Sequence, residues 1–321
     1  MSVDPSPRVM GQTRIGTICD PSPANFDLKS FLKYYLLSCK VDGKSQATID
    51  TYQIRLGLFV QFAEANGFPQ AGQLTSNNIR MFLLSLNDRH LQPATVHAYH
   101  RALRTWFTWL VNEGLLEKTP MQNIKPPRLP KKIPHPFSTQ DLENLLLLTS
   151  GNHFVDIRNR AIILTFLDTG LRLNELLSIK LIDISTEYDT IRVFGKGSKE
   201  RVVSLGKVAR KALLKYLMLR NDTYANLWVT EERRPLQRDG LRIIIRRLCE
   251  RAEITDAKHG AHTFRHTFAT NSIRNGANIF FVQSLLGHST LEMTRRYAGM
   301  INSETAVQKH NEFSPVDRFL K

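Results

Sequence analysis

Near its C-terminal end the chain reads His262-Thr-Phe-Arg-His266, then Leu286-Gly-His288, and then Arg295-Arg-Tyr297. His262 and Arg265 are three residues apart, so on a helix they would share a face. His262 also falls in the expected first turn of that helix, where outward-pointing backbone N–H groups favour an anion. A basic face beside such donors suits a phosphate group.

The two later motifs add a loop and a phenol to this basic face. Gly287 follows an apolar segment and is typical of a glycine that ends a helix, so His288 is predicted to be a loop residue. Residues 290–297 predict a further short helix that presents Tyr297. Several phosphate-binding groups therefore accompany a candidate tyrosine nucleophile.

Other interpretations of these motifs remain open at this point. A single histidine or tyrosine of this kind is more often structural, and a helix-turn-helix DNA-binding protein would carry a similar basic helix. His262 and His266 have the i, i+4 spacing of zinc ligands. Zinc is disfavoured because Arg265 lies between them and no carboxylate occurs in that helix.

The composition narrows the class of protein. A chain of 321 residues is long enough for about two domains. Its formal net charge of +15 favours a polyanionic partner, of which nucleic acid is the commonest, and the charge is not confined to one amphipathic helix as membrane-surface binding would require. The cysteines, Cys19, Cys39 and Cys249, are far apart, which predicts reduced thiols.

The sequence predicts an intracellular, soluble protein. No apolar run reaches membrane-spanning length, and the N-terminus shows no signal-peptide pattern.

The N-terminal half predicts a helical domain. After a flexible extension over residues 1–24, apolar periodicity predicts helices over residues 26–39, 45–65, 75–86 and 93–112. In the last of these, Tyr99, Trp106 and Phe107 form an aromatic stripe that we assign to the core. The polar faces carry basic residues that could meet phosphates, namely Lys44, Arg55, Arg101 and Arg104.

Residues 124–137 form a basic, proline-rich segment that cannot be helix interior and predicts a stiff linker. Its basic side chains, which suit contact with a polyanion, are Lys125, Arg128, Lys131 and Lys132. The predicted organisation is an extension over 1–24, a helical domain over 25–123, the linker, a second domain over 138–303 and a tail over 304–321.

The second domain begins with helical signals. Ser138 with Asp141 indicates a helix start, and a buried helix over residues 160–168 ends at Thr169-Gly170. Arg172 follows among leucines at the start of the next helix, where a guanidinium needs a partner or a bound anion. Glu175, one turn on, can orient it, and a purely structural Arg–Glu pair is an equal alternative.

A β-hairpin is the main strand signal. Residues 190–194 and 201–205 flank a Gly195-Lys-Gly-Ser-Lys-Glu200 turn, where Lys196 between two glycines can move into a site. A solvated basic loop is the default alternative, and Lys199 and Arg201 are expected to contact DNA. With helices over residues 207–220 and 238–253, the fold class is mainly α with a small antiparallel β-sheet in the C-terminal domain.

In chain order these candidates are Arg172, Lys196, His262, Arg265, His288 and Tyr297. Their order and spacing resemble the tyrosine recombinase (phage integrase) family, including the Xer-type recombinases. The matching stretches are Thr169-Gly-Leu-Arg-Leu-Asn-Glu175, Gly195-Lys-Gly-Ser-Lys-Glu-Arg201, His262-Thr-Phe-Arg265, Leu286-Gly-His288 and Tyr297. The resemblance extends from about residue 25 and implies a two-domain, C-shaped DNA clamp, with a helical core-binding (SAM-like) domain and a catalytic domain.

The resemblance implies a site-specific recombinase in which Tyr297 attacks a phosphodiester, leaving a 3′-phosphotyrosine and a 5′-hydroxyl. A phenol with a pKa of about 10 needs a base, and His262 matches that role. Arg172 and Arg265 would hold the non-bridging oxygens, with Glu175 positioning the first. His288 would add a hydrogen bond, and Lys196 would protonate the leaving oxygen.

The same resemblance implies no metal and no cofactor, double-stranded DNA as partner, and a tetramer in the synaptic complex, of one chain or with a related recombinase. Residues 304–321 would dock on a neighbouring protomer, with a disordered tail as the alternative. We expect the protein in the cytoplasm, associated with the nucleoid. The competing functions are a type IB topoisomerase-like enzyme and a non-catalytic DNA-binding protein.

Overall fold

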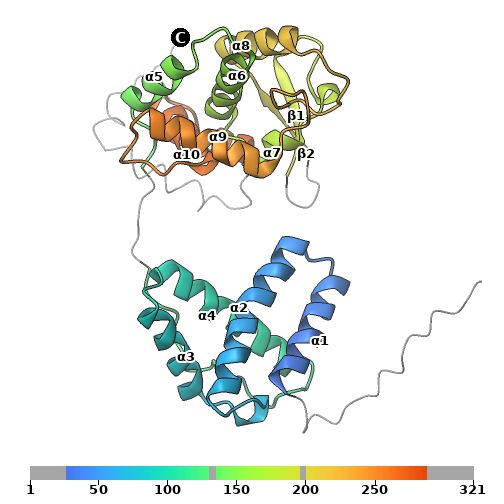
Figure 1. Cartoon of the computed structure of the whole chain (residues 1–321), viewed down its shortest axis with the longest axis vertical. Helices are drawn as coiled ribbons and strands as arrows, with labels where there is room; N and C mark the ends of the chain where they lie inside the picture. Colours follow the sequence, from blue (N-terminus) through green and yellow to red (C-terminus); the bar gives the residue numbers. More distant parts are fainter. Residues whose placement is uncertain (1–26, 130–134, 196–199, 288–321) are drawn as a thin grey trace, which may run out of the picture. The chain divides into compact units, whose positions relative to one another are not determined.

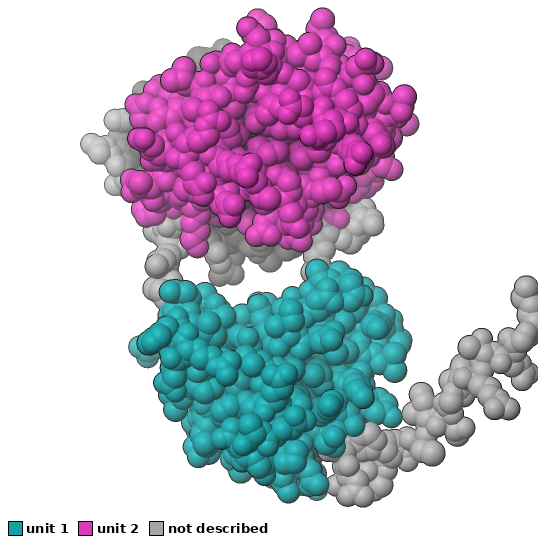
Figure 2. Space-filling model, in the orientation of Figure 1, with its two compact units in different colours: residues 1–131 teal, residues 132–321 magenta. Residues whose placement is uncertain are grey.

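The computed structural model describes residues 27–129, 135–195 and 200–287. The chain divides into two compact units, Met1–Lys131 and Lys132–Lys321, which Figure 2 distinguishes by colour. No helix within the described ranges is long and apolar enough to cross a membrane.

Over residues 27–129 the first unit consists of four α-helices and one 3-10 turn (Figure 1). They are α1 (Leu28–Val41), α2 (Gln46–Ala65), η2 (Ala71–Gln73), α3 (Ser76–Asp88) and α4 (Pro93–Asn112). Polar caps set the starts, because the side chains of Asp27, Ser45 and Thr75 accept hydrogen bonds from the exposed N–H groups of the first turns. All four helices that the sequence predicts are present, with ends displaced by at most two residues.

An aromatic core holds these helices together. Phe59 of α2 and Trp106 and Phe107 of α4 are fully buried, and Phe59 packs edge-to-face on Phe82 of α3 at 5.1 Å between ring centroids. Such pairs stabilise a core beyond the area that they bury. The aromatic stripe of α4 is therefore core, as predicted, with Tyr99 only partly buried at its edge.

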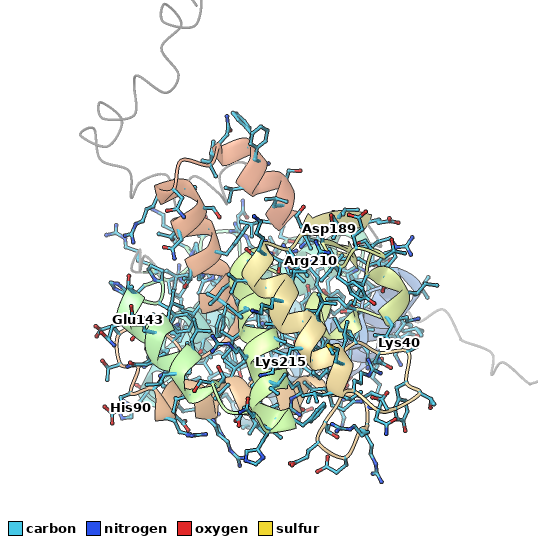
Figure 3. All side chains as sticks on the ribbon, turned by 90° about the horizontal axis from the view of Figure 1, so that it is seen from above. Lys40, His90, Glu143, Asp189, Arg210 and Lys215 are labelled. Carbon is cyan, nitrogen blue, oxygen red and sulfur yellow. The ribbon has the colours of Figure 1, made fainter. Side chains whose placement is uncertain are left out.

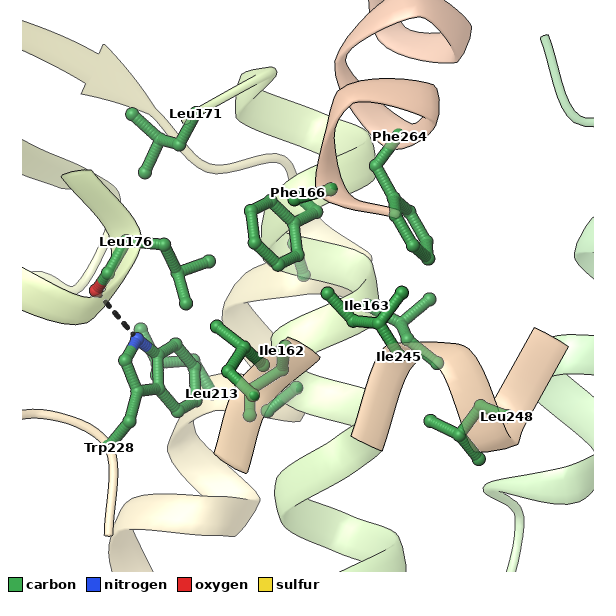
Figure 4. Close-up of a cluster of buried hydrophobic side chains, with 14 of the residues drawn as sticks. Ile162, Ile163, Phe166, Leu171, Leu176, Leu213, Trp228, Ile245, Leu248 and Phe264 are labelled. Carbon is green, nitrogen blue, oxygen red and sulfur yellow. Dashed lines mark hydrogen bonds between the residues drawn. The ribbon is translucent and has the colours of Figure 1, made fainter. Parts of the chain in front are cut away.

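The second unit has one helix that packs between other helices at its core. Its elements are α5 (Thr139–Leu148), α6 (Phe154–Thr169), α7 (Leu173–Ser178), η3 (Leu181–Asp183), β1 (Thr190–Phe194), β2 (Glu200–Ser204), α8 (Lys207–Leu219), α9 (Arg238–Arg251), α10 (Ala261–Arg274) and α11 (Ile279–Leu286). Helix α6 packs against α8 on one side and α10 on the other. Figure 4 shows Phe166 of α6 near Phe264 of α10, in a cluster that includes Trp228.

Helix α8 illustrates why apolar periodicity is informative here. Its residues Ala209, Leu213 and Tyr216 are buried on one face, while Lys215 is exposed and points outward in Figure 3.

The mainly helical fold with a small antiparallel sheet is confirmed. In that sheet β1 pairs with β2, with Val193 opposite Arg201.

Several predicted boundaries in the second unit differ from the structure. Strand β2 is displaced by one residue, and α8 and α9 end one and two residues early. The largest difference is in α6, which begins at Phe154 instead of Arg160. The early start escapes periodicity because Arg158 is buried in that turn. Its guanidinium donates to Asn159 and to the carbonyl of Val229, contacts that no local pattern reveals.

Gly170 ends α6 in a left-handed conformation, with φ of 60°. A Cβ at this position would lie 2.4 Å from Cδ1 of Phe268 and 2.7 Å from Cδ2 of Leu286. Glycine is therefore required both by the backbone and by close packing against α10 and α11. This close packing places the start of α7 beside the middle of α10 and the end of α11.

Candidate active site

The turn from α6 into α7 builds the first part of the site. Arg172 is the residue that precedes α7, and its backbone N–H donates to Oε2 of Glu175 at 2.9 Å. Its guanidinium donates through Nη1 to Oε1 of the same carboxylate at 2.8 Å. The Arg172 side chain is 35% exposed, whereas Glu175 is 5% exposed, so the carboxylate lies beneath the arginine that faces solvent.

A second arginine reaches the same carboxylate from the hairpin. Arg201 of β2 donates from Nη1 to Oε1 of Glu175 at 3.1 Å and from Nη2 to Oε2 at 2.8 Å. Burial alone would raise the pKa of Glu175, but the hydrogen bonds from Arg201 and from Arg172 outweigh burial and lower the pKa to about 2. Glu175 is thus a carboxylate throughout the physiological range.

Arg201 has contacts unlike those expected of a DNA-binding surface residue. Besides its two bonds to Glu175, its Nε donates to the carbonyl of Leu285 at 2.8 Å, and its side chain is only 14% exposed. All three nitrogens of this side chain therefore donate hydrogen bonds to neighbouring protein groups.

Arg265 comes from α10 and is almost fully buried, at 4% exposed. Its Nη1 donates to the carbonyl of Gly170 at 2.9 Å and its Nη2 to the carbonyl of Leu286 at 2.7 Å. These bonds link the end of α6 to the end of α11. Arg265 thereby fixes the backbone two residues before Arg172 and two residues before His288.

His262 lies in the first turn of α10, and the residue is exposed. Partial desolvation of the ring lowers its pKa, and the positive charges of Arg265 and Arg172 lower it further. The lowered pKa favours the neutral imidazole, which is the form that a general base needs before it takes a proton. The described part of the site therefore unites Arg172, Glu175, His262 and Arg265 in one corner of the second unit.

The remaining predicted site residues are distributed as follows. Lys196, His288, Tyr297, Lys199, Lys131 and Lys132 lie outside the described residues, as do the predicted helix over 290–297, the extension over 1–24 and the tail over 304–321. Lys44 pairs with Asp42, and Lys125 and Arg128 are exposed. Within the described ranges, no group of three histidine, cysteine or acidic residues has the geometry of a metal site.

Two of the predicted DNA contacts in the first unit line one groove. Arg55 of α2 and Arg101 of α4 border a shallow cavity of about 360 Å³. Hydroxyl groups from both helices lie in the same groove, contributed by Thr48, Thr51, Tyr52 and Thr105. Arg104 is exposed one turn further along α4. Guanidiniums next to hydroxyl donors match the contacts that proteins make with phosphate groups.

Helix α9 carries basic residues that the sequence interpretation did not select. Leu241, Ile245, Leu248 and Cys249 form its buried face. Its exposed arginines are Arg238, Arg242, Arg246, Arg247 and Arg251. Their density in Arg238–Arg251 was a usable signal, since a stripe of arginine along one helix is the footprint of a polyanion-binding surface.

Both units match models of one protein family. Residues 137–303 match the phage integrase family, and residues 28–114 match the phage integrase N-terminal SAM-like domain. The chain is 31% identical to tyrosine recombinase XerC of Anoxybacillus flavithermus, over 85% of this chain and 92% of that protein. It is 29% identical to tyrosine recombinase XerD of Halalkalibacterium halodurans over the same shares of the two chains.

Solved structures of recombinases are also similar to this chain. A XerH site-specific recombinase bound to difH substrate in a pre-cleavage complex matches with a TM-score of 0.66 and 25% identity, over 87% of this chain and 94% of that one. A lambda integrase dimer bound to a core site matches with a TM-score of 0.69 and 17% identity, over 84% and 97%, and shows likeness of fold.

The family match and the similarity to these recombinases identify a tyrosine-type site-specific recombinase. The chain belongs to the phage integrase family.

Proposed function

We propose that this recombinase cuts and rejoins DNA through a covalent 3′-phosphotyrosine intermediate on Tyr297, without a metal or ATP. The observation that carries the proposal is the convergence of Arg172, Glu175, His262 and Arg265 from α7 and α10 on one corner of the second unit. The family match does not favour a topoisomerase-like enzyme or a non-catalytic DNA-binding protein as the alternative.

His262 is the proposed base for the phenol of Tyr297. Its lowered pKa keeps the imidazole unprotonated at neutral pH, which a base requires. The two arginines that lower this pKa are also the proposed phosphate ligands. The same positive charge would therefore stabilise both the neutral imidazole and the charge that grows on the phosphate oxygens in the transition state.

Arg172 is the better placed of the two arginines for direct contact, since its side chain is 35% exposed and Glu175 holds it from below. Arg265 is buried and shares its guanidinium with two backbone carbonyls, so its contact with a non-bridging oxygen would come from the inner side of the site. We propose that His288 donates a further bond and that Lys196 protonates the leaving 5′-oxygen. The phosphotyrosine ester would retain the energy of the broken phosphodiester, so another 5′-hydroxyl could attack it, form a new phosphodiester and release Tyr297.

Double-stranded DNA is the proposed partner of both units, which together would close around the duplex as a clamp. In the first unit the groove between α2 and α4 presents Arg55 and Arg101. Lys44 lies just before α2, and Arg104 lies one turn after Arg101 in α4. In the linker and hairpin, Lys125, Arg128, Lys131, Lys132 and Lys199 would contact phosphates. The exposed arginines of α9 supply a third surface.

Strand exchange between two duplexes would need four protomers, either of this chain or of this chain and a related recombinase. We propose that residues 304–321 dock on a neighbouring protomer and that the protein acts in the cytoplasm, at the nucleoid. The proposed domains are 25–123 and 138–303, joined by the linker over 124–137. The two family matches and the division of the chain at Lys131–Lys132 support these bounds.

A covalent-capture experiment tests the function. The protein is incubated with sheared genomic DNA of its own organism without metal, the reaction is stopped in denaturant, and the DNA that remains attached to protein is sequenced. We expect recovery of one short site, and its loss in Tyr297→Phe but not in Tyr224→Phe, which alters an exposed tyrosine of the same unit. Failure to capture DNA, or capture by Tyr297→Phe, would refute the proposal.

The captured site then separates recombination from relaxation. Two plasmid copies of the site should recombine in the presence of the wild-type protein, whereas supercoiled DNA without the site should stay supercoiled. Relaxation without recombination would show a topoisomerase-like enzyme.

A further inference from the structure

We propose that Arg201 is a positioning residue for the recombination chemistry. Its hydrogen bonds connect strand β2 to the Arg172–Glu175 pair and to the end of α11. They would thereby hold in place the described residues on the C-terminal side of Lys196 and on the N-terminal side of His288. This inference rests on the proposed function, because it concerns the same site.

The guanidinium of Arg201 joins three separate parts of the second unit. It lies on β2, it binds both oxygens of Glu175 in α7, and its Nε donates to the carbonyl of Leu285 in α11. A planar fork with a third donor suits this arrangement, and an ammonium group cannot reproduce it. Arg201 is therefore the side chain through which hairpin, α7 and α11 share one set of hydrogen bonds.

The end of α11 shows what this arrangement controls. The last carbonyls of a helix have no partner within the helix, and here Leu285 receives Arg201 while Leu286 receives Arg265. Gly287 then turns the chain with φ of 62°, and a Cβ added there would lie 3.3 Å from Nη1 of Arg201. The guanidinium thus lies against the backbone directly before His288.

The hairpin end is held by the same residue. Arg201 is opposite Val193 in the sheet, and Lys196 follows two residues after the end of β1 at Phe194. Movement of β2 would need Arg201 to leave Glu175, a buried carboxylate that would then lose two of its four donors. The base of the hairpin is therefore anchored to the residue that also holds Arg172.

This geometry distinguishes positioning from DNA contact. All three side-chain nitrogens of Arg201 donate to protein groups, and two of them bind the Glu175 carboxylate, which balances the charge of the guanidinium. Its replacement should disturb the alignment of catalytic groups without removing a phosphate contact. A misplacement of about 1 Å at a reacting centre costs about 100-fold in rate.

The test separates binding from chemistry with the variants Arg201→Lys and Arg201→Ala. Arg192→Lys is the matched control, because Arg192 lies on the paired strand β1 with its side chain 44% exposed. A nicked duplex carrying the captured site traps the covalent adduct. DNA affinity and its salt dependence, the single-turnover cleavage rate at saturating DNA, and the melting temperature are measured for each protein.

For Arg201→Lys we expect unchanged affinity and salt slope, and a cleavage rate lower by roughly 10- to 100-fold. The control should cleave like the wild type. Millimolar guanidinium should restore part of the rate of Arg201→Ala by occupying the vacated position, whereas the same concentration of sodium chloride should not.

An Arg201→Lys protein that cleaves at the wild-type rate would overturn the positioning role. So would a variant that loses affinity, with a salt slope smaller by about 1, but keeps its rate at saturating DNA, because that result marks a phosphate contact. A wild-type protein that forms no adduct would instead refute the proposed function itself, and with it the reaction that Arg201 is proposed to serve.

Discussion

Replacement of Glu175 by glutamine should destabilise the second unit in a pH-dependent way. The carboxylate receives four hydrogen bonds, two from Arg201 and two from Arg172, and it is buried. Glutamine keeps the shape of the side chain, but its NH2 group would face the N–H donors of Arg172 or Arg201 instead of accepting from them. Two guanidiniums then remain without a charged partner.

The magnitude follows from the pKa. The native pKa of Glu175 is about 2 against 4.5 for the free side chain. With 1.36 kcal/mol per pKa unit, the charged carboxylate stabilises the folded unit by roughly 3 kcal/mol at neutral pH. Because the folded pKa is depressed, this contribution is complete above about pH 5 and is lost as the pH falls towards 2. At about pH 3 roughly 1 kcal/mol should remain, since the unfolded chain is by then mostly protonated.

Urea titrations of the wild type and of Glu175→Gln at a series of pH values measure this difference. A short hydrogen-exchange pulse at each urea concentration measures unfolding separately in peptides from each unit. The first unit, which lacks the substitution, then serves as an internal control. Glu143→Gln is the matched variant, because Glu143 lies exposed on α5 of the same unit (Figure 3). Its free energy of unfolding should stay close to that of the wild type.

The reasoning would be refuted by a Glu175→Gln protein as stable as the wild type at neutral pH. A difference in unfolding free energy that stayed constant from neutral pH to about pH 3 would refute it too, since the loss would then not come from the carboxylate charge.

Three further predictions concern backbone and DNA contacts. Gly170→Ala should destabilise the second unit by about 2–4 kcal/mol in urea unfolding, from left-handed strain plus the clash with Phe268, and no loss would contradict the packing described. Gly57→Ala, within α2 with nothing within 4 Å of the added Cβ, should stabilise the first unit by about 0.5–1 kcal/mol in the same assay, and a loss would contradict it. Arg55→Gln and Arg101→Gln should each weaken DNA binding for all sequences and reduce the salt slope by about 1, measured by affinity at several salt concentrations, and an unchanged slope would exclude phosphate contact.

Local sequence signals were sufficient for most elements. Caps at Thr75 and Ser138 marked helix starts, and Gly170 and Gly287 marked helix ends, because capping depends on residues within one turn of each other. The start of α6 was missed where Arg158 is buried by partners outside its turn. Family membership also followed from short motifs in a fixed order, which need no coordinates.

The alternatives left open for Arg172 and Glu175 needed the fold. The sequence allows a purely structural pair and a phosphate-binding pair equally well. In the structure the Glu175 carboxylate accepts hydrogen bonds from both Arg172 and Arg201. The sequence predicts Arg201 as a DNA contact next to the basic hairpin turn. Its partners showed that its guanidinium is turned inward.

The sequence by itself was sufficient to predict most helices, the basic charge and the family, and to lead us to expect two domains. Only the tertiary structure decided which arginines share the Glu175 carboxylate. Arg201 is 26 residues from Glu175 and 84 residues from Leu285, yet donates to both. Helical and strand periodicity reports neighbours a few residues apart, whereas contacts of this range exist only after α7, β2 and α11 have packed together.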